Sequence, residues 1–286
     1  MFLLFINDMQ EHLESNLRLF ADDALLYHKI THENDSQALE RDLDKIGLWA
    51  ERWQMVFNPS KCYKMTVHRN RSLILKDYTL YNQILSDVKQ HPYLGVLLSS
   101  DLRWNSHVND VVKKANSTLG FVKRNLYSCS EVTKRAAYVT LIRPHLEYAS
   151  AVWDPYRQEQ VDKIEAVQRR AVRFIKQDYD WNSSVTRMQQ LLSLDPLRER
   201  RKAHRLKTFH LAVNNNIAVP IPDYYQHSER YTRNYSSTTY IQPRARHDCY
   251  LYSFFPRTIK DWNCLPIETR AQSYPAFCAQ LNKLSI

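Results

Sequence analysis

Two adjacent aspartates, Asp22 and Asp23, stand between two apolar runs and are the side chains best placed to do chemistry. The apolar runs predict two strands, and aspartate favours the tight turn that would join them. The two carboxylates repel each other, but they offer the hard oxygen ligands that Mg²⁺ prefers. In a two-metal site, ions roughly 3.5–4 Å apart bind the attacking and leaving oxygens of a phosphoryl transfer. A pair of solvated turn acids is the alternative interpretation.

The composition limits the classes of function. The chain has 286 residues, 44% of them hydrophobic and 24% charged, which suits one large or two small globular domains. A net charge of +10 indicates an acidic partner, with nucleic acid ahead of a membrane surface. The three glycines, Gly47, Gly95 and Gly120, are too scattered to form a glycine-rich phosphate loop. No apolar run reaches the length of a membrane span, so we expect no membrane partner.

The five cysteines are widely spaced and form no CxxC pair. Their odd number predicts free thiols and an intracellular protein, in the cytoplasm or the nucleus. A zinc site in which four side chains converge in space is a minor alternative: His247, Cys249, Cys264 and Cys278.

The order of several motifs resembles the reverse transcriptases of non-LTR retrotransposons of the jockey or CR1-like kind. The apolar start resembles a segment that precedes the catalytic hairpin in that family, and Phe20–Asp23 resembles the hairpin itself. The likeness continues through an Asn-Pro-x-Lys turn, a Tyr-Leu-Gly-Val run and a C-terminal signature. The matching segments are Met1–Met9, Phe20–Asp23, Asn58–Lys61, Tyr93–Val96, Asp101–Trp104, Tyr148–Pro155 and Phe254–Pro266.

The resemblance implies an RNA-directed DNA polymerase that works by two-metal catalysis with Mg²⁺ or Mn²⁺. It implies that Asp22 is a metal ligand, that Asp23 supports it, and that Lys61 assists the leaving pyrophosphate. It also implies that Tyr93, Leu94 and Gly95 belong to the strand that grips the primer. The expected partners are an RNA template with a DNA primer or another nucleic acid. A solvated turn lysine is the alternative for Lys61.

The implied fold is α+β, with a partial palm over residues 1–104. Apolar spacing predicts a helix from Asp35 or Ser36 to about Gln54, followed by an edge strand over 62–67 and a short hairpin around Tyr81. The run His91–Leu98 predicts one strand with an interior glycine, which often marks a bulge or a close approach of another backbone.

Helical patterns dominate residues 105–213, and the resemblance implies that this region is a thumb. We expect helices over about 108–126, from Glu131 to Ile142 before Pro144, over 160–175 and from Pro196. Residues 101–215 carry 21 Lys and Arg against 12 Asp and Glu. Because several helices lean towards the same charge, we expect a surface that contacts phosphates, although solvated basic faces are the alternative. The candidates are Lys113, Arg124, Arg169, Arg173, Lys176, Arg198, Arg201 and Arg205.

Residues 214–247 are rich in Asn, Pro, Ser, Tyr and Arg, and we expect an irregular linker there. Residues 248–286 hold the retrotransposon-type signature, whose physical pattern is that of a packed helix ending at Leu265-Pro266.

The sequence also departs from the family pattern. The strand with the family's other catalytic Asp, the fingers and the template-contacting segment have no counterpart, so we expect a truncated chain that is inactive by itself. A missing fingers and palm segment is then an expected partner. Asp8 or Asp44 could replace the missing metal ligand, but nothing in their spacing argues for it. The alternatives are a non-catalytic nucleic-acid-binding remnant and an interaction module without nucleic acid.

Overall fold

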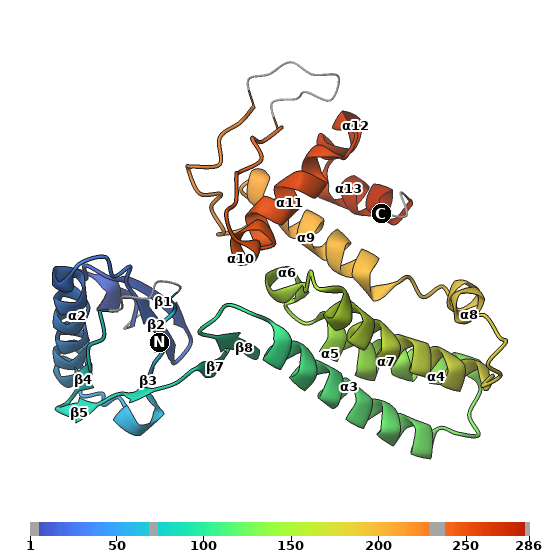
Figure 1. The fold of residues 1–286 in the computed structure, drawn as a ribbon, viewed down its shortest axis with the longest axis horizontal. Coiled ribbons are helices and arrows are strands. Elements are labelled where there is room, and N and C mark those ends of the chain that lie inside the picture. Colours follow the sequence, from blue (N-terminus) through green and yellow to red (C-terminus); the bar gives the residue numbers. More distant parts are fainter. Residues whose placement is uncertain (1–5, 69–73, 229–237, 284–286) are drawn as a thin grey trace. The chain divides into compact units, whose positions relative to one another are not determined.

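The computed structural model describes residues 6–68, 74–228 and 238–283. The chain divides into two compact units, which are described separately below (Figure 1). The first unit comprises Met1–Tyr93 with Leu98–Leu102, and the second comprises Leu94–Leu97 with Arg103–Ile286.

The first unit is built on an antiparallel hairpin packed against a long helix. Its elements are a 3₁₀ turn η1 (Asn7–Gln10), strands β1 (Asn16–Phe20) and β2 (Asp23–Tyr27), and helix α2 (Glu33–Arg52). Leu17 faces Leu26 across the hairpin and is buried with Met9 and Ile46, so the inner face of the hairpin packs against η1 and α2. Of the apolar start, residues 1–5 lie outside the described residues.

Helix α2 begins two residues before Asp35, which was one of two predicted caps. The Asp35 carboxylate instead closes the first turn from inside the helix, where it accepts hydrogen bonds from the backbone N–H groups of Thr31 (2.7 Å) and His32 (2.8 Å). The Thr31 hydroxyl donates a third bond to this carboxylate (2.7 Å), and the three bonds, with that from the hydroxyl the largest influence, lower the pKa of Asp35. The rest of the predicted helix, to about Gln54, is confirmed to Arg52.

Short elements complete the first unit. A 3₁₀ turn η2 (Pro59–Lys61) precedes strand β3 (Tyr63–Lys64), which pairs in parallel with β6 (Ser86–Asp87). The short hairpin expected around Tyr81 is confirmed as β4 (Thr79–Leu80) and β5 (Gln83–Ile84).

The prediction of a single strand over His91–Leu98 is wrong. Strand β7 (Gln90–Tyr93) ends at a turn, and β8 (Val96–Ser99) returns to pair with it. The turn residues Leu94 and Gly95 have φ angles of 47° and 78°, and positive φ at both central residues is the mark of a type I′ hairpin. The apolar run therefore folds back on itself because Gly95 permits a left-handed conformation that a continuous strand excludes.

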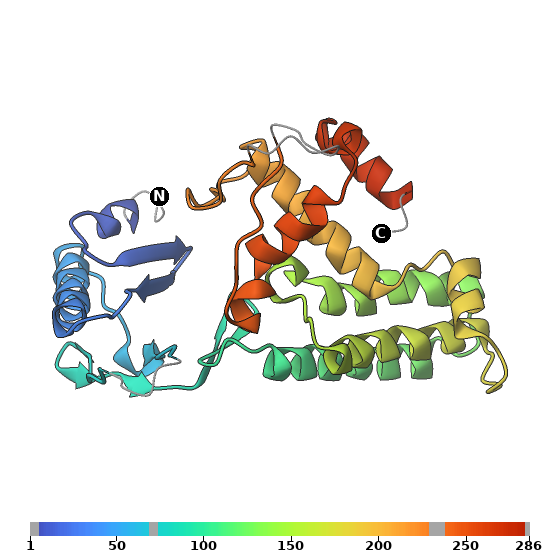
Figure 2. The same ribbon diagram turned by 45° about the horizontal axis from the view of Figure 1, so that its top comes forward.

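The second unit begins as a bundle of helices, which confirms the helical patterns of residues 105–213. In both views α3 and α7 lie side by side (Figures 1 and 2), and Lys163 of α7 donates a hydrogen bond to Asn109 of α3. The elements are α3 (Asn105–Asn125), α4 (Glu131–Ala137), a π-helical turn η3 (Tyr138–Ile142), α5 (Arg143–Glu147), α6 (Ser150–Trp153), α7 (Gln158–Lys176), α8 (Val185–Leu191) and α9 (Leu197–Val213).

The predicted end of a helix before Pro144 is only partly correct, because the chain stays helical past this residue. The π-helical turn η3 precedes it, and Pro144 then lies in the first turn of α5. Proline is tolerated in a first turn because its missing N–H would have no helical acceptor there.

The C-terminal part of this unit has an aromatic core. It contains α10 (Asp248–Leu251), α11 (Phe254–Asn263), α12 (Ile267–Arg270) and α13 (Tyr274–Lys283). Phe209 of α9, Trp262 of α11 and Phe277 of α13 are fully buried together. Figure 2 shows α11 running across α9. The helix predicted for the C-terminal signature is thus confirmed as α11.

The described parts of residues 214–247 form no helix or paired strand beyond one isolated bridge between His227 and Tyr240. Nevertheless, Tyr225 and Tyr240 are buried in the aromatic core. The side chain of Asn263 holds this segment, because it accepts from the backbone N–H of Tyr240 (3.2 Å) and donates to its carbonyl (2.7 Å). The described part of the segment is therefore packed against α11.

The combination of helices and small sheets is an α+β fold, as expected. Within the described residues, no helix has both the length and the apolar composition that crossing a bilayer requires.

Candidate functional site

The predicted turn between the two strands carries the aspartate pair. In the β1–β2 register Phe20 faces Asp23, so that Ala21 and Asp22 form a two-residue loop and Asp23 begins β2. Both aspartates are exposed. Ala21 adopts a left-handed φ of 52°, an uncommon conformation for a residue with a Cβ atom. The hairpin therefore presents two neighbouring carboxylates to solvent on a strained turn.

The donor set of this turn suits one hard cation. Mg²⁺ is usually bound by one or two carboxylates, with the remaining positions filled by waters and substrate phosphates. Within the described residues, no group of three or more His, Cys, Asp or Glu side chains gathers where it could hold a metal ion. Asp8 and Asp44 therefore form no such group with the pair. Asp8 instead accepts a hydrogen bond from the indole N–H of Trp49 (2.8 Å).

The alternative prediction of a zinc site also finds no group of ligands among the described residues. His247, Cys249, Cys264 and Cys278 are all described, and they form no cluster. The described cysteines are free thiols.

Beside the aspartate turn lies a hollow of about 290 Å³. Leu19 and Ala24 of the hairpin line one part of it, and Trp49 and Phe57 line another. Asp22 also lines the hollow, whose other lining residues are apolar.

Lys61 is exposed at the end of η2. The Asn58 side chain caps this turn by accepting from the backbone N–H of Ser60 (3.0 Å). Among the described residues, no hydrogen bond or ion pair joins Lys61 to either aspartate.

The residues that resemble a primer grip form the tip of the β7–β8 hairpin. The Tyr148 hydroxyl donates to the Leu94 carbonyl (3.0 Å). A Cβ atom added at Gly95 would lie 3.1 Å from Cε1 of Tyr148, so the close approach inferred from the glycine involves an aromatic ring. Further along, the Leu97 N–H donates to Nδ1 of His107, and burial lowers the pKa of this histidine.

Four of the predicted phosphate-binding side chains are exposed on the helical unit: Lys113 and Arg124 on α3, Arg169 on α7 and Arg198 on α9. Arg169 makes one long hydrogen bond, to the Asp162 carbonyl (3.4 Å). Exposed guanidinium and ammonium groups of this kind are available to phosphates.

Two further candidates bind protein groups. Nη1 of Arg173 donates to the Asp178 (3.4 Å) and Asp180 (2.8 Å) carbonyls, which holds the loop after α7. Lys176 forms an ion pair with Glu131 of α4 (2.8 Å). Both side chains therefore have structural partners.

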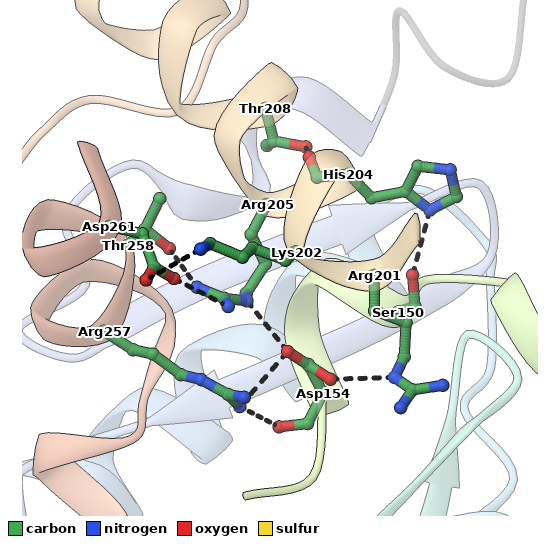
Figure 3. Close-up of polar contacts among 10 residues, drawn as sticks. All are labelled: Ser150, Asp154, Arg201, Lys202, His204, Arg205, Thr208, Arg257, Thr258 and Asp261. Atoms are coloured by element: carbon green, nitrogen blue, oxygen red, sulfur yellow. Dashed lines mark hydrogen bonds and ion pairs between the residues drawn. The ribbon is translucent and has the colours of Figure 1, made fainter. Parts of the chain in front are cut away.

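Arg201 and Arg205 do not lie on the basic flank that the sequence predicts for α9. They are 0% and 2% exposed, and each binds one carboxylate oxygen of the buried Asp154 at 2.8 and 2.9 Å (Figure 3). Periodicity indicates which residues share a helix face. It does not show that a residue from another segment, here Asp154, packs against that face.

The same ion-pair cluster includes two residues of the C-terminal signature. Arg257 of α11 pairs with Asp154 (3.2 Å), and Asp261 pairs with Arg205 (3.0 Å). The polar residues of the signature thus attach α11 to α9 and to the turn after α6. Sequence reasoning identified the signature but missed Asp154 as its partner.

Sequence reasoning also missed two cations between α3 and α7. Arg170 donates to the Asn116 side chain, and the Lys123 ammonium lies 5.9 Å from the centre of the Phe174 ring. Burial, with a further contribution from the charge of Arg170, lowers the pKa of Lys123. No carboxylate pairs with either cation among the described residues, so an external anion would relieve their repulsion.

Sequence similarity links the chain to polymerases of mobile elements. A probable RNA-directed DNA polymerase from transposon BS of Drosophila melanogaster is 26% identical over 175 residues, 58% of this chain and 19% of that protein. An RNA-directed DNA polymerase from mobile element jockey of Drosophila funebris is 27% identical over 164 residues, 54% of this chain and 17% of that protein. A probable polymerase from transposon X-element of Drosophila melanogaster is 25% identical over 189 residues, 61% of this chain and 20% of that protein.

These relatives confirm the resemblance to non-LTR retrotransposon reverse transcriptases that the sequence motifs carry. The chain spans about a fifth of the length of the curated relatives it matches. No family model and no solved structure matches it.

Proposed function

We propose that this chain is part of an RNA-directed DNA polymerase of a mobile element, with a metal-binding hairpin and a basic helical surface that holds the primed template. The observation that carries the proposal is the exposed pair Asp22 and Asp23 on a two-residue turn, in a chain similar to RNA-directed DNA polymerases. The first unit corresponds to a partial palm and the bundle of the second unit to a thumb.

In this proposal Asp22 is the metal ligand and Asp23 supports it. Mg²⁺ or Mn²⁺ supplies charge stabilisation of the transferring phosphoryl group when bound. The protein residues do the rest: Lys61 binds the pyrophosphate that leaves, and the Leu94–Gly95 turn next to Tyr93 contacts the primer. Tyr148 keeps this turn in place through its hydrogen bond to Leu94.

The helical unit supplies the phosphate-binding surface. Lys113, Arg124, Arg169 and Arg198 are exposed, and the cations between α3 and α7 add unpaired positive charge beside them. We leave Arg201 and Arg205 out of this surface because they are buried, and Arg173 and Lys176 because protein groups already bind them.

We further propose that the chain by itself holds a primed template without extending it. Two-metal catalysis needs protein ligands for two ions, and the described residues offer no third acid beside the pair. A further palm and fingers segment would then be the partner that completes the site. Extension of a primed RNA template by the chain alone, lost in Asp22→Ala/Asp23→Ala, would contradict this proposal.

Binding of a fluorescent primed RNA template, measured by anisotropy as a function of salt, tests the phosphate-binding surface. Each neutralised phosphate contributes about 0.7–0.9 to the slope of log affinity against log salt. Removing three exposed cations should therefore reduce the slope by about 2–3. The test variant is Lys113→Gln/Arg124→Gln/Arg169→Gln, and the matched control is Arg187→Gln/Lys207→Gln/Lys260→Gln. Equal slopes for the two variants would contradict the assigned surface.

The second candidate is a nucleic-acid-binding remnant without chemistry. The absence of a three-acid cluster from the described residues favours it. Metal-independent binding that is unchanged in Asp22→Ala, together with no metal binding at the hairpin, would identify the remnant.

A further inference from the structure

The hollow beside the aspartate turn combines an apolar lining with one charge. Its lining includes Met9, Leu19 and Ala24 on the hairpin side and the aromatic rings of Trp49 and Phe57. Among the described residues that line the hollow, Asp22 alone is charged. Sites for small molecules are typically concave, mostly apolar and supplied with a few polar groups that fix orientation.

Both the Asp22 carboxylate and the apolar lining of the hollow are open to a ligand. Asp22 is exposed, and none of the hydrogen bonds or ion pairs found among the described residues involves its carboxylate. Val56 at the rim is 83% exposed, so the hollow is accessible from solvent. An apolar body would be removed from water between Trp49 and Phe57, while a positive end would approach the Asp22 carboxylate.

We propose that this hollow is a binding site for a small hydrophobic cation, such as a protonated alkylamine that carries an aromatic ring. The apolar part fills the space between the rings, and the ammonium group pairs with Asp22. A neutral molecule of the same shape binds more weakly, because it gains the apolar contacts without the ion pair. An anion binds most weakly, because it meets the carboxylate. This inference does not depend on polymerase activity.

Three ligands of one shape and different charge test the proposal: 4-phenylbutylamine, 4-phenylbutan-1-ol and 4-phenylbutanoate. Their affinities are measured by saturation-transfer NMR titration of the full chain at low salt. Exposed ion pairs give modest gains, so we expect the amine to bind up to about fivefold more tightly than the alcohol. The carboxylate should be the weakest of the three.

Matched variants assign the preference to one carboxylate. Asp22→Asn should remove the advantage of the amine over the alcohol, whereas Asp23→Asn should keep it, because Asp23 does not line the hollow. Val56→Lys adds a positive charge at an exposed rim position, and it should reduce the advantage of the amine because it offsets the charge of Asp22.

The proposal is overturned if none of the three ligands binds saturably. It is also overturned if the amine keeps its advantage in Asp22→Asn, or if Val56→Lys does not reduce that advantage. A failed polymerase or metal test has no bearing on these outcomes, because no nucleic acid or metal is present in the titration.

Discussion

Aspartates of this chain lie in three different kinds of surroundings. Asp22 and Asp23 are exposed on a turn, where a cation can reach them. Asp42 is fully buried, and it accepts from the Ser15 N–H (2.7 Å) and from Lys45 (3.0 Å). Asp154 is also buried, but among arginines. Residue type alone therefore does not distinguish these aspartates, and the sequence predicted a chemical role only for the pair on the turn.

The strain at Ala21 gives a prediction at the residue scale. A left-handed conformation costs a residue with a Cβ atom about 1–2 kcal/mol, and glycine avoids most of this cost. We expect Ala21→Gly to stabilise the protein by about 0.5–1 kcal/mol in urea unfolding. A loss of stability would show that Ala21 is not strained in solution.

The buried Asp42 gives a pH dependence. Burial, the largest influence, raises its pKa, but the bonds from Ser15 and Lys45 outweigh it, and the net pKa is lowered. A lowered folded-state pKa means that its contribution is present above the unfolded pKa of about 3.9 and is lost as the pH falls.

We therefore expect Asp42→Asn to cost about 1–3 kcal/mol at pH 7, because it weakens the buried hydrogen bond from Ser15 and the part-buried one from Lys45. The difference from the wild type should shrink as the pH falls below about 4. Urea unfolding at a series of pH values measures both effects. A difference that stays constant with pH would contradict the assignment.

At the scale of elements, apolar periodicity predicted the long helices and missed features that depend on single backbone conformations. Helices α2, α3 and α7 each carry a continuous apolar stripe, which fixes their type and their approximate ends, whereas the buried face of α9 includes Arg201 and Arg205. The β7–β8 hairpin was missed because Tyr93–Val96 has the composition of a buried strand. Its turn depends on positive φ angles, which composition does not reveal.

The turn at Gly95 can be tested against a helical glycine. Gly95→Ala should destabilise the protein by about 1–2 kcal/mol, because its φ is +78° and the new Cβ would lie 3.1 Å from the Tyr148 ring. Gly120→Ala should stabilise by about 0.5–1 kcal/mol, since Gly120 lies within α3 with its nearest new contact at 3.5 Å. Thermal unfolding of the two variants should shift in opposite directions, and a shared direction would contradict the turn geometry.

The ion pairs between α9 and α11 are a second test at this scale. Asp154→Asn leaves three guanidinium groups, those of Arg201, Arg205 and Arg257, short of a carboxylate partner. Breaking a buried ion pair typically costs about 3–5 kcal/mol. The control is Glu159→Gln, which removes an exposed pair with Lys163 and should change little. Equal unfolding midpoints for the two variants would contradict a structural role for the cluster.

At the scale of the whole molecule, composition predicted a basic protein with a nucleic-acid partner, but not which cations remain on the surface. Arg201 and Arg205 count towards the net charge, yet both are buried beside Asp154. Tyr225 and Tyr240 likewise pack into a core from a segment whose composition is that of a linker. Both results depend on contacts between residues far apart in the chain, which local patterns do not contain.

The central claim is that the hairpin carboxylates bind a divalent metal ion. Electron paramagnetic resonance of Mn²⁺, titrated into the full chain with a primed RNA template present, tests it most directly. We expect bound Mn²⁺ in the wild type and its loss in Asp22→Ala/Asp23→Ala, with template binding kept. Equal Mn²⁺ binding by the wild type and the double variant would contradict the claim and leave the pair as solvated turn acids.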